Sequence, residues 1–333
     1  MSAIVLDVQD LSVNFALHQR EVKAVADLSF QLSEGETLAV VGESGSGKSQ
    51  AFLAIMGLLA RNGRATGRAI AGGTDLLALS RRELDKRRGR DIAMIFQDPM
   101  TSLNPSLKIR KQLAEVLIRH RGYSRERAAT RVIEMLERVG IPEPAKRANA
   151  YPHELSGGMR QRVMIAMALL CEPKILIADE PTTALDVTVQ AQILDLFQEL
   201  TDDFGTALVL ITHDLGVVAG IADRMMVMYA GRAVEKGTVD DLFYDPRHPY
   251  TFGLLHSTPH VEERGVRLAP IKGLPPSLEQ LPPGCAFNPR CAFRFDRCLS
   301  ERPLLIPRVR ERLSACFYEG ELKVETLVED AAE

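Results

Sequence analysis

The stretch TLAVVGESGSGKS at residues 37–49 decides the fold. Its first five residues are mostly apolar and predict a buried strand, and GESGSGKS at 42–49 follows without a break. KSQAFLAIMGLLA at 48–60 then has the apolar spacing of a helix. A strand, a glycine-rich loop and a helix in this order, with the pattern G-x-x-x-x-G-K-[ST], predict a loop that binds the phosphates of a nucleotide.

The chemistry of this loop follows from its residue types. Glycines let successive backbone N–H groups point at phosphate oxygens, and the following helix adds the positive end of its dipole. We expect Lys48 to place its ammonium group on the β- and γ-phosphates and Ser49 to offer its hydroxyl to Mg²⁺. The alternative is a glycine-rich turn that arose by chance. The residues expected to bind ATP here are Gly42, Glu43, Ser44, Gly45, Ser46, Gly47, Lys48, Ser49 and Gln50.

Two adjacent carboxylates follow a second apolar strand, in KILIADE at 174–180. Ligands bind outside the carboxyl ends of the strands in an open α/β sheet, so Asp179 is expected to hold Mg²⁺ through water. Because successive strand residues point to opposite faces, we expect Glu180 on the other side, where it polarises the attacking water as a general base. The alternative for Glu180 is a cap on the next turn.

Polar residues end two further predicted strands. Gln97 ends AMIFQ and His213 ends LVLITH. Each taken alone could be an ordinary polar group with its hydrogen bonds satisfied. Because the carboxyl ends of parallel strands lie along one edge of a sheet, the two side chains are expected to converge on the nucleotide.

The rest of the chain predicts an α/β core interrupted by helices. The predicted strands and helices are short strands over 4–41, which include IVLDV at 4–8 and LSVNFAL at 11–17, a strand at 92–96, helices over 105–170, strands at 174–179 and 206–212, and a helix at 187–204. From about residue 237 the chain becomes proline-rich and weakly periodic. That change predicts an appended segment rather than a continuation of the sheet.

Composition is that of an ordinary globular protein. The chain has 333 residues, 46% hydrophobic and 26% charged, with a net charge of -3, which points to no nucleic-acid partner. The basic run RRELDKRRGR at 81–90 is local and is expected to be a solvated face.

The sequence begins without the pattern of a signal peptide, and no apolar run approaches the length of a membrane span. A cytosolic protein is therefore expected.

A second glycine pair lies in ELSGGMRQR at 154–162, just before an apolar run. Ser156, Gly157 and Gly158 could form a second phosphate site at a helix N-terminus, where backbone N–H groups favour anions without a lysine. The alternative is a tight turn in which the serine is only the N-cap. The motif alone does not decide between them.

These motifs together resemble an ATPase subunit of an ABC transporter. They are GESGSGKS, Gln97, LSGGM at 155–159, ILIADEP at 175–181, TALD at 183–186 and THD at 212–214. The resemblance covers roughly residues 5–237. It implies an α/β P-loop NTPase fold with a RecA-like core, an antiparallel β subdomain and a helical subdomain at about 98–172. It also implies an ATPase domain at 1–237.

The resemblance assigns further roles by position. Gln97 is similar to a glutamine that touches Mg²⁺ or the attacking water, so Ser49, Gln97 and Asp179 are the expected Mg²⁺ residues. His213 is similar to a histidine that contacts the γ-phosphate and supports the general base. Ser156, Gly157, Gly158 and Asp186 are implied to lie across a head-to-tail dimer, against ATP held by a partner ATPase. Phe15 is the candidate that stacks on adenine, although a core residue is the alternative.

Longer stretches resemble the oligopeptide/dipeptide permease branch, most closely its D-type ATPase. These stretches include MIFQDPMTSLNP, THDLGVVAGIADRMMVMYAGR and the tail DPRHPYTFGLL…LPPGCAFNPRC, so the C-terminal extension at 238–333 is included. The implied partners are a non-identical F-type ATPase, two transmembrane permeases and an extracytoplasmic binding protein, at the cytoplasmic face of the membrane. Nickel, glutathione or cell-wall peptides are alternative cargoes. A soluble ABC-type ATPase and a non-hydrolysing regulatory subunit are alternative functions.

Four of the five cysteines crowd into the extension. Cys285, Cys291, Cys298 and Cys316 follow the spacing C-x₅-C-x₆-C-x₁₇-C. Four thiols this close in a cytosolic chain suggest a metal, but zinc sites usually contain a tighter C-x₂₋₄-C pair. A [4Fe–4S] cluster accepts varied spacing, and members of the branch with this pattern carry one. Zinc and free thiols remain the alternatives, and a cluster is expected to act as a structural staple.

Overall fold

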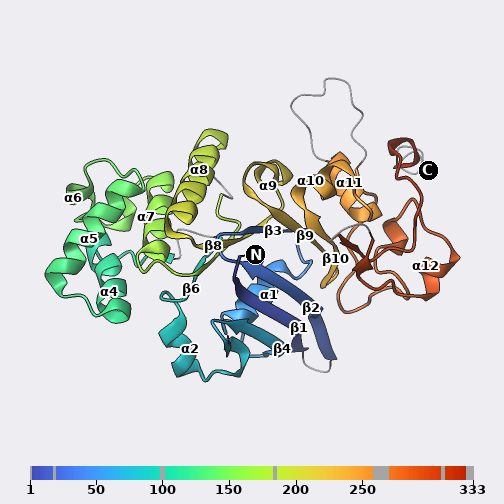
Figure 1. The fold of residues 1–333 in the computed structure, drawn as a ribbon, viewed down its shortest axis with the longest axis horizontal. Coiled ribbons are helices and arrows are strands. Elements are labelled where there is room, and N and C mark those ends of the chain that lie inside the picture. Colours follow the sequence, from blue (N-terminus) through green and yellow to red (C-terminus); the bar gives the residue numbers. More distant parts are fainter. Residues whose placement is uncertain are drawn as a thin grey trace. The chain divides into compact units, whose positions relative to one another are not determined.

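The computed structural model describes residues 2–17, 20–97, 102–182, 186–257, 270–308 and 312–327. The chain, drawn as a ribbon in Figure 1, divides into two compact units. One unit consists of residues 1–7, 31–37 and 70–211, and the other of residues 8–30, 38–69 and 212–333. Within the described residues, no helix has both the length and the apolar character needed to cross a lipid bilayer.

The first unit contains a parallel sheet of short, mostly apolar strands. They are β6 (Ile92–Ile95), β7 (Ile175–Asp179) and β8 (Ala207–Thr212). Ile175 of β7 lies opposite both Ile92 and Ala207. Every residue of β7 and β8 is buried, as the nearly continuous apolar runs predict for a parallel sheet.

Helices make up most of the rest of the first unit (Figure 1). They are α2 (Arg81–Arg87), α4 (Ile109–Arg121), α5 (Arg125–Arg138), α6 (Pro144–Arg147), α7 (Gly157–Leu169) and α8 (Val187–Phe204), with 3₁₀ turns η1 (Leu76–Ala78) and η2 (Pro152–Glu154). α5 buries Ala128, Val132 and Leu136, one apolar stripe at helical spacing. α2 lies in the basic run and buries only Leu84, so that run is a solvated helix face as expected.

The second unit holds the strand and helix around the glycine-rich loop. β3 (Thr37–Val41) pairs in parallel with β9 (Arg224–Tyr229), which pairs antiparallel with β10 (Arg232–Thr238). α1 spans Lys48–Ile55 and is shorter than the predicted 48–60. It ends because Gly57 adopts φ 60°, a left-handed conformation that stops a helix.

A separate sheet has the strand order β2-β1-β4-β5. Its strands are β1 (Ile4–Leu17), β2 (Arg20–Ser33), β4 (Gly63–Ala71) and β5 (Thr74–Asp75). Two strands predicted near the N-terminus are one strand, β1, which bends at Asp10 with φ 50°. A Cβ on Gly67 would lie 2.5 Å from the Asp10 carbonyl oxygen, so glycine is required opposite this bend.

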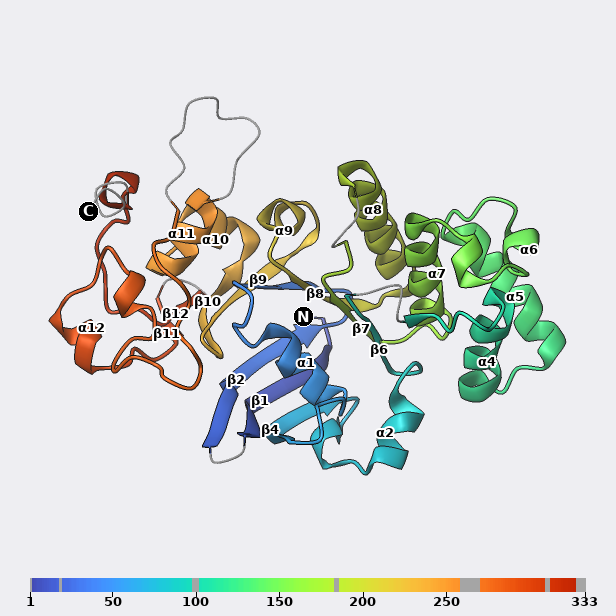
Figure 2. The ribbon, with the colours of Figure 1, turned by 180° about the vertical axis from the view of Figure 1, so that it is seen from behind.

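The extension contains short elements. They are α10 (Val239–Tyr244), α11 (Pro249–Ser257), η3 (Asn288–Arg290), α12 (Asp296–Ser300), β11 (Ile306–Pro307) and β12 (Leu313–Ser314). The helix α9 (Leu215–Ile221) comes earlier in the chain, before β9. The prediction that the extension does not continue the sheet was wrong. β12 pairs antiparallel with β10, and β11 pairs with β12 (Figure 2). Two-residue strands carry too little periodicity to be predicted from sequence.

Candidate functional site

The glycine-rich loop links β3 to α1, as predicted. Gly42 has φ 149° and Gly47 has φ 96°. A Cβ on Gly42 would lie 2.2 Å from the Met228 carbonyl oxygen, and one on Gly47 would lie 2.4 Å from the Ala24 carbonyl oxygen. Because no side chain tolerates such an approach to backbone, both ends of the loop require glycine.

The middle of the loop is open. Ser44 and Gly45 are exposed, and no atom lies within 4 Å of a Cβ built on Gly45. Ser46 is buried, and its carbonyl accepts a hydrogen bond of 3.0 Å from the N–H of Gly231. The loop is therefore held at its ends and accessible at its centre, which suits a ligand that meets backbone N–H groups.

Lys48 lies at the start of α1 and folds back over the loop. Its ammonium group donates to the carbonyl oxygens of Gly42 at 2.6 Å and Glu43 at 3.0 Å. Ser49 and Gln50 follow in the first turn of α1 and are half-buried. The Lys48 ammonium group, the one charge that the G-x-x-x-x-G-K-[ST] pattern requires, therefore lies directly at the loop. Phosphate oxygens of a bound nucleotide can replace the two carbonyl oxygens as its hydrogen-bond acceptors.

Glu43 is held by two residues that sequence reasoning did not single out. Its backbone N–H donates to the Tyr250 hydroxyl at 2.8 Å, and its carboxylate binds the Arg290 guanidinium at 2.6 and 2.9 Å. These partners are 207 and 247 residues away along the chain. No local pattern in a sequence connects such distant positions, so only the tertiary structure reveals them.

The first unit brings Gln97 and Glu180 together. The Gln97 side-chain amide donates to the Glu180 carboxylate at 2.9 Å. Asp179 is the last residue of β7 and is 8% exposed. The first unit thus shows a direct contact between Gln97 and Glu180, while the predicted convergence of Gln97 and His213 on the nucleotide stays a prediction.

The argument that strand alternation places Glu180 was wrong. β7 ends at Asp179, and Glu180 has φ 46°, in the left-handed region. Its N–H donates to the Ile211 carbonyl at 2.9 Å. A left-handed bend, rather than the alternation of an extended strand, therefore directs this carboxylate.

His213 directly follows β8 and is exposed. The residues beside it are fixed: the Asp214 N–H donates to the Thr212 hydroxyl at 3.0 Å, and Asp214 caps α9. The backbone on both sides of His213 is thus anchored, and its side chain faces the surface. His213 belongs to the second unit and Glu180 to the first, so the expected approach of His213 to Glu180 stays a prediction.

The second glycine pair begins a helix, and Ser156 is its N-cap. The Ser156 hydroxyl accepts a hydrogen bond from the Met159 N–H at 3.3 Å. Ser156 and Gly157 are exposed, and a Cβ on Gly157 would meet no atom within 4 Å. Capping is therefore present, and the exposed helix N-terminus is also free to meet an anion.

The start of α8 lies beside this helix start. A Cβ on Gly158 would lie 3.2 Å from the Val189 side chain. Asp186 is the N-cap of α8 and accepts a hydrogen bond of 2.9 Å from the Val189 N–H. The two positions expected to face a partner ATPase thus lie close together. The other residues of the TALD motif, 183–185, lie outside the described residues.

Phe15 lies near the end of β1 and is half-buried. A Cβ on Gly63 would lie 2.8 Å from its ring, so the ring packs directly on the start of β4. This packing fits the core alternative, while the exposed part of the ring leaves the adenine role as a prediction.

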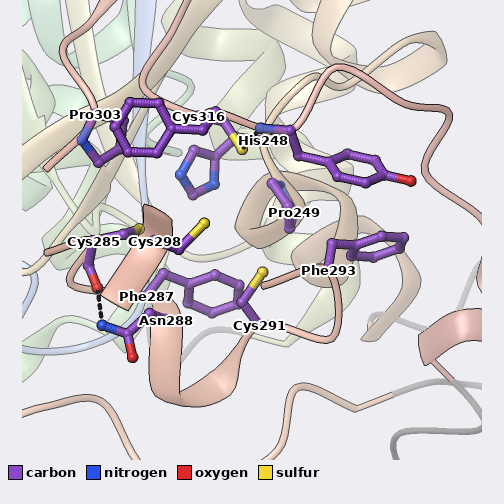
Figure 3. A pocket seen from close by; sticks show the side chains of 12 residues that line it. His248, Pro249, Cys285, Phe287, Asn288, Cys291, Phe293, Cys298, Pro303 and Cys316 are labelled. Atoms are coloured by element: carbon purple, nitrogen blue, oxygen red, sulfur yellow. Dashed lines mark hydrogen bonds between the residues drawn. The ribbon is translucent and has the colours of Figure 1, made fainter. Parts of the chain in front are cut away.

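The four cysteines of the extension line one small cavity, shown in Figure 3. Its lining also includes His248 and Phe287, and its volume is about 10 Å³, roughly the space of one water molecule. In Figure 3 the sulfur atoms of Cys285, Cys291, Cys298 and Cys316 are directed toward this common space. The fold therefore gathers the cysteines that the sequence singled out.

The electrostatics of this cavity favour neutral thiols. Burial raises the pKa of Cys285 and Cys291, and it raises the pKa of Cys316 to about 12. A positive metal centre is what stabilises thiolates in such a place. Across the described part of the chain, no group of three or more His, Cys, Asp or Glu side chains is arranged to hold a metal ion.

Comparison with known families follows the same division of the chain. The pattern of the family "ABC transporter" matches residues 25–183, and that of "Oligopeptide/dipeptide transporter, C-terminal region" matches residues 234–298. Among solved structures, a dimeric post-hydrolysis state of the ATP-binding cassette MJ0796 with ADP and Pi aligns with a TM-score of 0.63 at 30% identity. It covers 70% of this chain and 98% of that one. The predicted P-loop NTPase fold is thereby confirmed.

Relatives match nearly end to end. The oligopeptide transport ATP-binding protein OppD of Salmonella typhimurium is 55% identical over 314 residues, covering 94% of this chain and 93% of the relative. The dipeptide transport ATP-binding protein DppD of Bacillus subtilis is 55% identical, covering 88% of both. Since both family patterns match in order and the relatives match over almost their whole length, the chain belongs to the ABC transporter family, as an ATPase of its oligopeptide/dipeptide branch.

Proposed function

We propose that this ATPase energises the import of oligopeptides or dipeptides. The similarity to OppD and DppD over nearly the whole chain carries the proposal, because it includes the extension as well as the ATPase motifs. The ATPase domain is assigned to residues 1–237, with a helical subdomain at about 98–172, and the extension to 238–333. Nickel, glutathione and cell-wall peptides are the alternative cargoes, and an uptake assay distinguishes them from oligopeptides.

The described side chains divide the hydrolytic work. Lys48 and the loop N–H groups would hold the β- and γ-phosphates. By the family resemblance, Ser49, Gln97 and Asp179 would hold Mg²⁺, Asp179 through water, and the ion would neutralise phosphate charge. Glu180 takes a proton from the attacking water as general base. The 2.9 Å hydrogen bond from Gln97 orients the Glu180 carboxylate for this step. By its resemblance to the family's γ-phosphate histidine, His213 is proposed to support Glu180.

A second ATPase completes each site. The exposed N-terminus of α7, with Ser156 and Gly157, is the part that meets ATP held by a partner. A solved relative of similar fold, MJ0796, is a dimer. We propose a non-identical F-type subunit as the partner here, in head-to-tail packing. Asp186, beside the start of α7, lies at the same interface.

The transporter also needs membrane components. We propose two transmembrane permeases and an extracytoplasmic binding protein, with this chain bound peripherally at the cytoplasmic face. The helical segment after Gln97 is the proposed contact with a permease. A soluble ABC-type ATPase without permeases is the rival, and failure of the chain to co-purify with any membrane permease would favour it.

The four extension cysteines are proposed to hold a [4Fe–4S] cluster. The four thiols match the donor set of such a group, and the cavity between them, which has the size of one water molecule, must widen to admit it. The spacing C-x₅-C-x₆-C-x₁₇-C lacks the tight C-x₂₋₄-C pair that zinc sites usually contain, which weighs against zinc. When bound, the cluster supplies four covalent links that staple the extension.

Iron and sulfide assays on anaerobically purified protein test this proposal. The intact chain is expected to contain both, and Cys291→Ser to lose them. Cys171→Ser is the control, because Cys171 is buried apart from this cavity, against the Val116 carbonyl. Absence of iron and sulfide from the intact chain removes the cluster.

Uptake of labelled oligopeptides by native cells tests the main proposal. Glu180→Gln keeps the size of the side chain but removes the base, so it is expected to bind ATP, lose nearly all turnover and abolish uptake. Near-normal hydrolysis by this variant would refute the role of Glu180. If hydrolysis is lost but peptide uptake is unchanged, with no redundant system present, the cargo is one of the alternatives.

A further inference from the structure

Arg290 of the extension reaches into the phosphate-binding loop. Its two terminal nitrogens donate to the two carboxylate oxygens of Glu43, at 2.6 and 2.9 Å. The Arg290 side chain is only 5% exposed, against 28% for Glu43. A two-point pair sheltered from water is stronger and more directional than a surface ion pair. This contact therefore fixes the direction of the Glu43 side chain.

Arg290 is itself held from the side of the extension. Its Nε donates to the Lys272 carbonyl at 2.9 Å, and a terminal nitrogen lies 3.4 Å from the Tyr229 hydroxyl. It ends the 3₁₀ turn η3, immediately before Cys291. The guanidinium therefore has little freedom to follow the loop if the loop moves.

Tyr250 adds a second contact to the same loop residue. Its hydroxyl accepts the Glu43 N–H, and its ring is fully buried. The ring packs on Tyr229 and Phe287, with ring centroids 4.6 and 5.3 Å away. Two residues of the extension therefore hold Glu43: Tyr250 binds its backbone N–H and Arg290 binds its carboxylate.

The consequence for ATP is electrostatic. Glu43 stands between Gly42 and Ser44, so the loop that is proposed to hold the phosphates itself carries a negative side chain. Without a positive partner, the Glu43 carboxylate repels the negative phosphates of a nucleoside triphosphate. We propose that Arg290 is a positioning residue for the ATP site, which neutralises Glu43 and holds the loop in the form that binds ATP. This inference rests on the proposed ATP site.

A double-mutant cycle on the full chain tests the inference. Arg290→Ala is expected to weaken MgATP binding, measured by titration calorimetry, by about tenfold, within the range of coupling energies of contacting charged groups. In the background of Glu43→Gln, where no carboxylate remains to be neutralised, Arg290→Ala is expected to cause little further loss. In the assembled transporter, the KM for ATP should rise while kcat changes little.

Two further variants guard against simple misfolding. Arg290→Lys keeps the positive charge but cannot contact both carboxylate oxygens as a guanidinium does. Its affinity for MgATP is therefore expected to lie between that of the intact chain and that of Arg290→Ala. Arg297→Ala is the matched control, because Arg297 lies in α12 of the extension and pairs with Glu301 instead. It is expected to bind MgATP like the intact chain.

The outcomes separate this inference from the proposed function. If the intact chain does not bind MgATP, the ATP site itself fails. If the intact chain binds and folded Arg290→Ala or Arg290→Lys binds equally well, only the role of Arg290 is overturned. The role of Arg290 is also overturned if Arg290→Ala lowers MgATP affinity by the same factor in the intact chain and in the Glu43→Gln background. The effect of Arg290 would then not depend on the Glu43 carboxylate.

Discussion

At the scale of single residues, the phosphate-binding loop shows what a residue type implies and what it does not. Glycine at 42 and 47 was predicted from the pattern, and the structure supplies the reason, since a Cβ at either position would overlap a carbonyl oxygen. The left-handed backbone of Glu180 was not predicted, because any residue can be forced into it by its surroundings at a cost of roughly 1–3 kcal/mol.

Gly42→Ala tests the steric argument. The added Cβ meets the Met228 carbonyl at 2.2 Å, so the loop must move, and MgATP binding is expected to fall by at least about tenfold in titration calorimetry. Gly35→Ala is the control, because Gly35 also has positive φ, 71°, but no atom within 4 Å of its Cβ. It should lose about 1 kcal/mol of stability and retain binding. Equal binding by both variants would contradict the argument.

At the scale of elements, side-chain caps define where helices begin. Ser124 caps α5, Ser156 caps α7 and Asp186 caps α8, each accepting an N–H three residues along. α8 has the bounds that its sequence predicts because a cap and Gly205, with φ 60°, mark both ends. β1 was split in the prediction because its bend at Asp10 interrupts the apolar pattern.

Ser156→Ala separates the capping role of Ser156 from a nucleotide role. Loss of the cap is expected to cost about 1 kcal/mol of unfolding free energy in urea denaturation. Ser124→Ala removes an equivalent cap from α5, far along the chain from any ATP motif, and should cost a similar amount. Only Ser156→Ala should also lower ATP turnover in the assembled transporter. Equal ATP turnover by Ser156→Ala and Ser124→Ala would show that Ser156 only caps its helix and has no role toward the nucleotide.

At the scale of the whole molecule, a buried carboxylate joins the extension to an ATPase strand. Glu235 of β10 is fully buried and accepts the N–H groups of Arg247 and His248, at 2.6 and 3.1 Å. Within the extension, Arg312, 3% exposed, pairs with Asp245 at 2.9 Å. Charged groups as well as apolar packing therefore hold the extension in place.

Burial of Glu235 predicts a pH dependence of stability. Burial raises the pKa of Glu235 to about 7 from its ordinary value of 4.5. The folded chain therefore binds this proton more tightly than the unfolded chain, and the resulting stabilisation is complete below about pH 4.5 and lost as the pH rises through about 7. Glu235→Gln is expected to remove this decline, measured as the thermal midpoint between about pH 5 and 7.

The comparison must be made between variants, because His248 acts in the opposite direction. Burial lowers the pKa of His248 to about 3, so its contribution to stability grows as the pH rises toward its ordinary value of 6.5. His248 is present in both proteins and cancels in the difference. Glu319→Gln, at an exposed carboxylate, is the control and should follow the intact chain. A Glu235→Gln profile parallel to that of the intact chain would contradict the prediction.

The sequence by itself determined the family, the fold class, the order of the motifs and most of the helices, because these depend on residue type and on short-range periodicity. It also placed the four cysteines together in one segment, and the structure sets them around one cavity. Only the tertiary structure decided that the extension continues the sheet through β12, that Glu180 leaves its strand in a left-handed bend, and that Arg290 and Tyr250 hold Glu43. Each of these depends on groups that are distant in sequence and meet only in the folded chain, where no local pattern reports them.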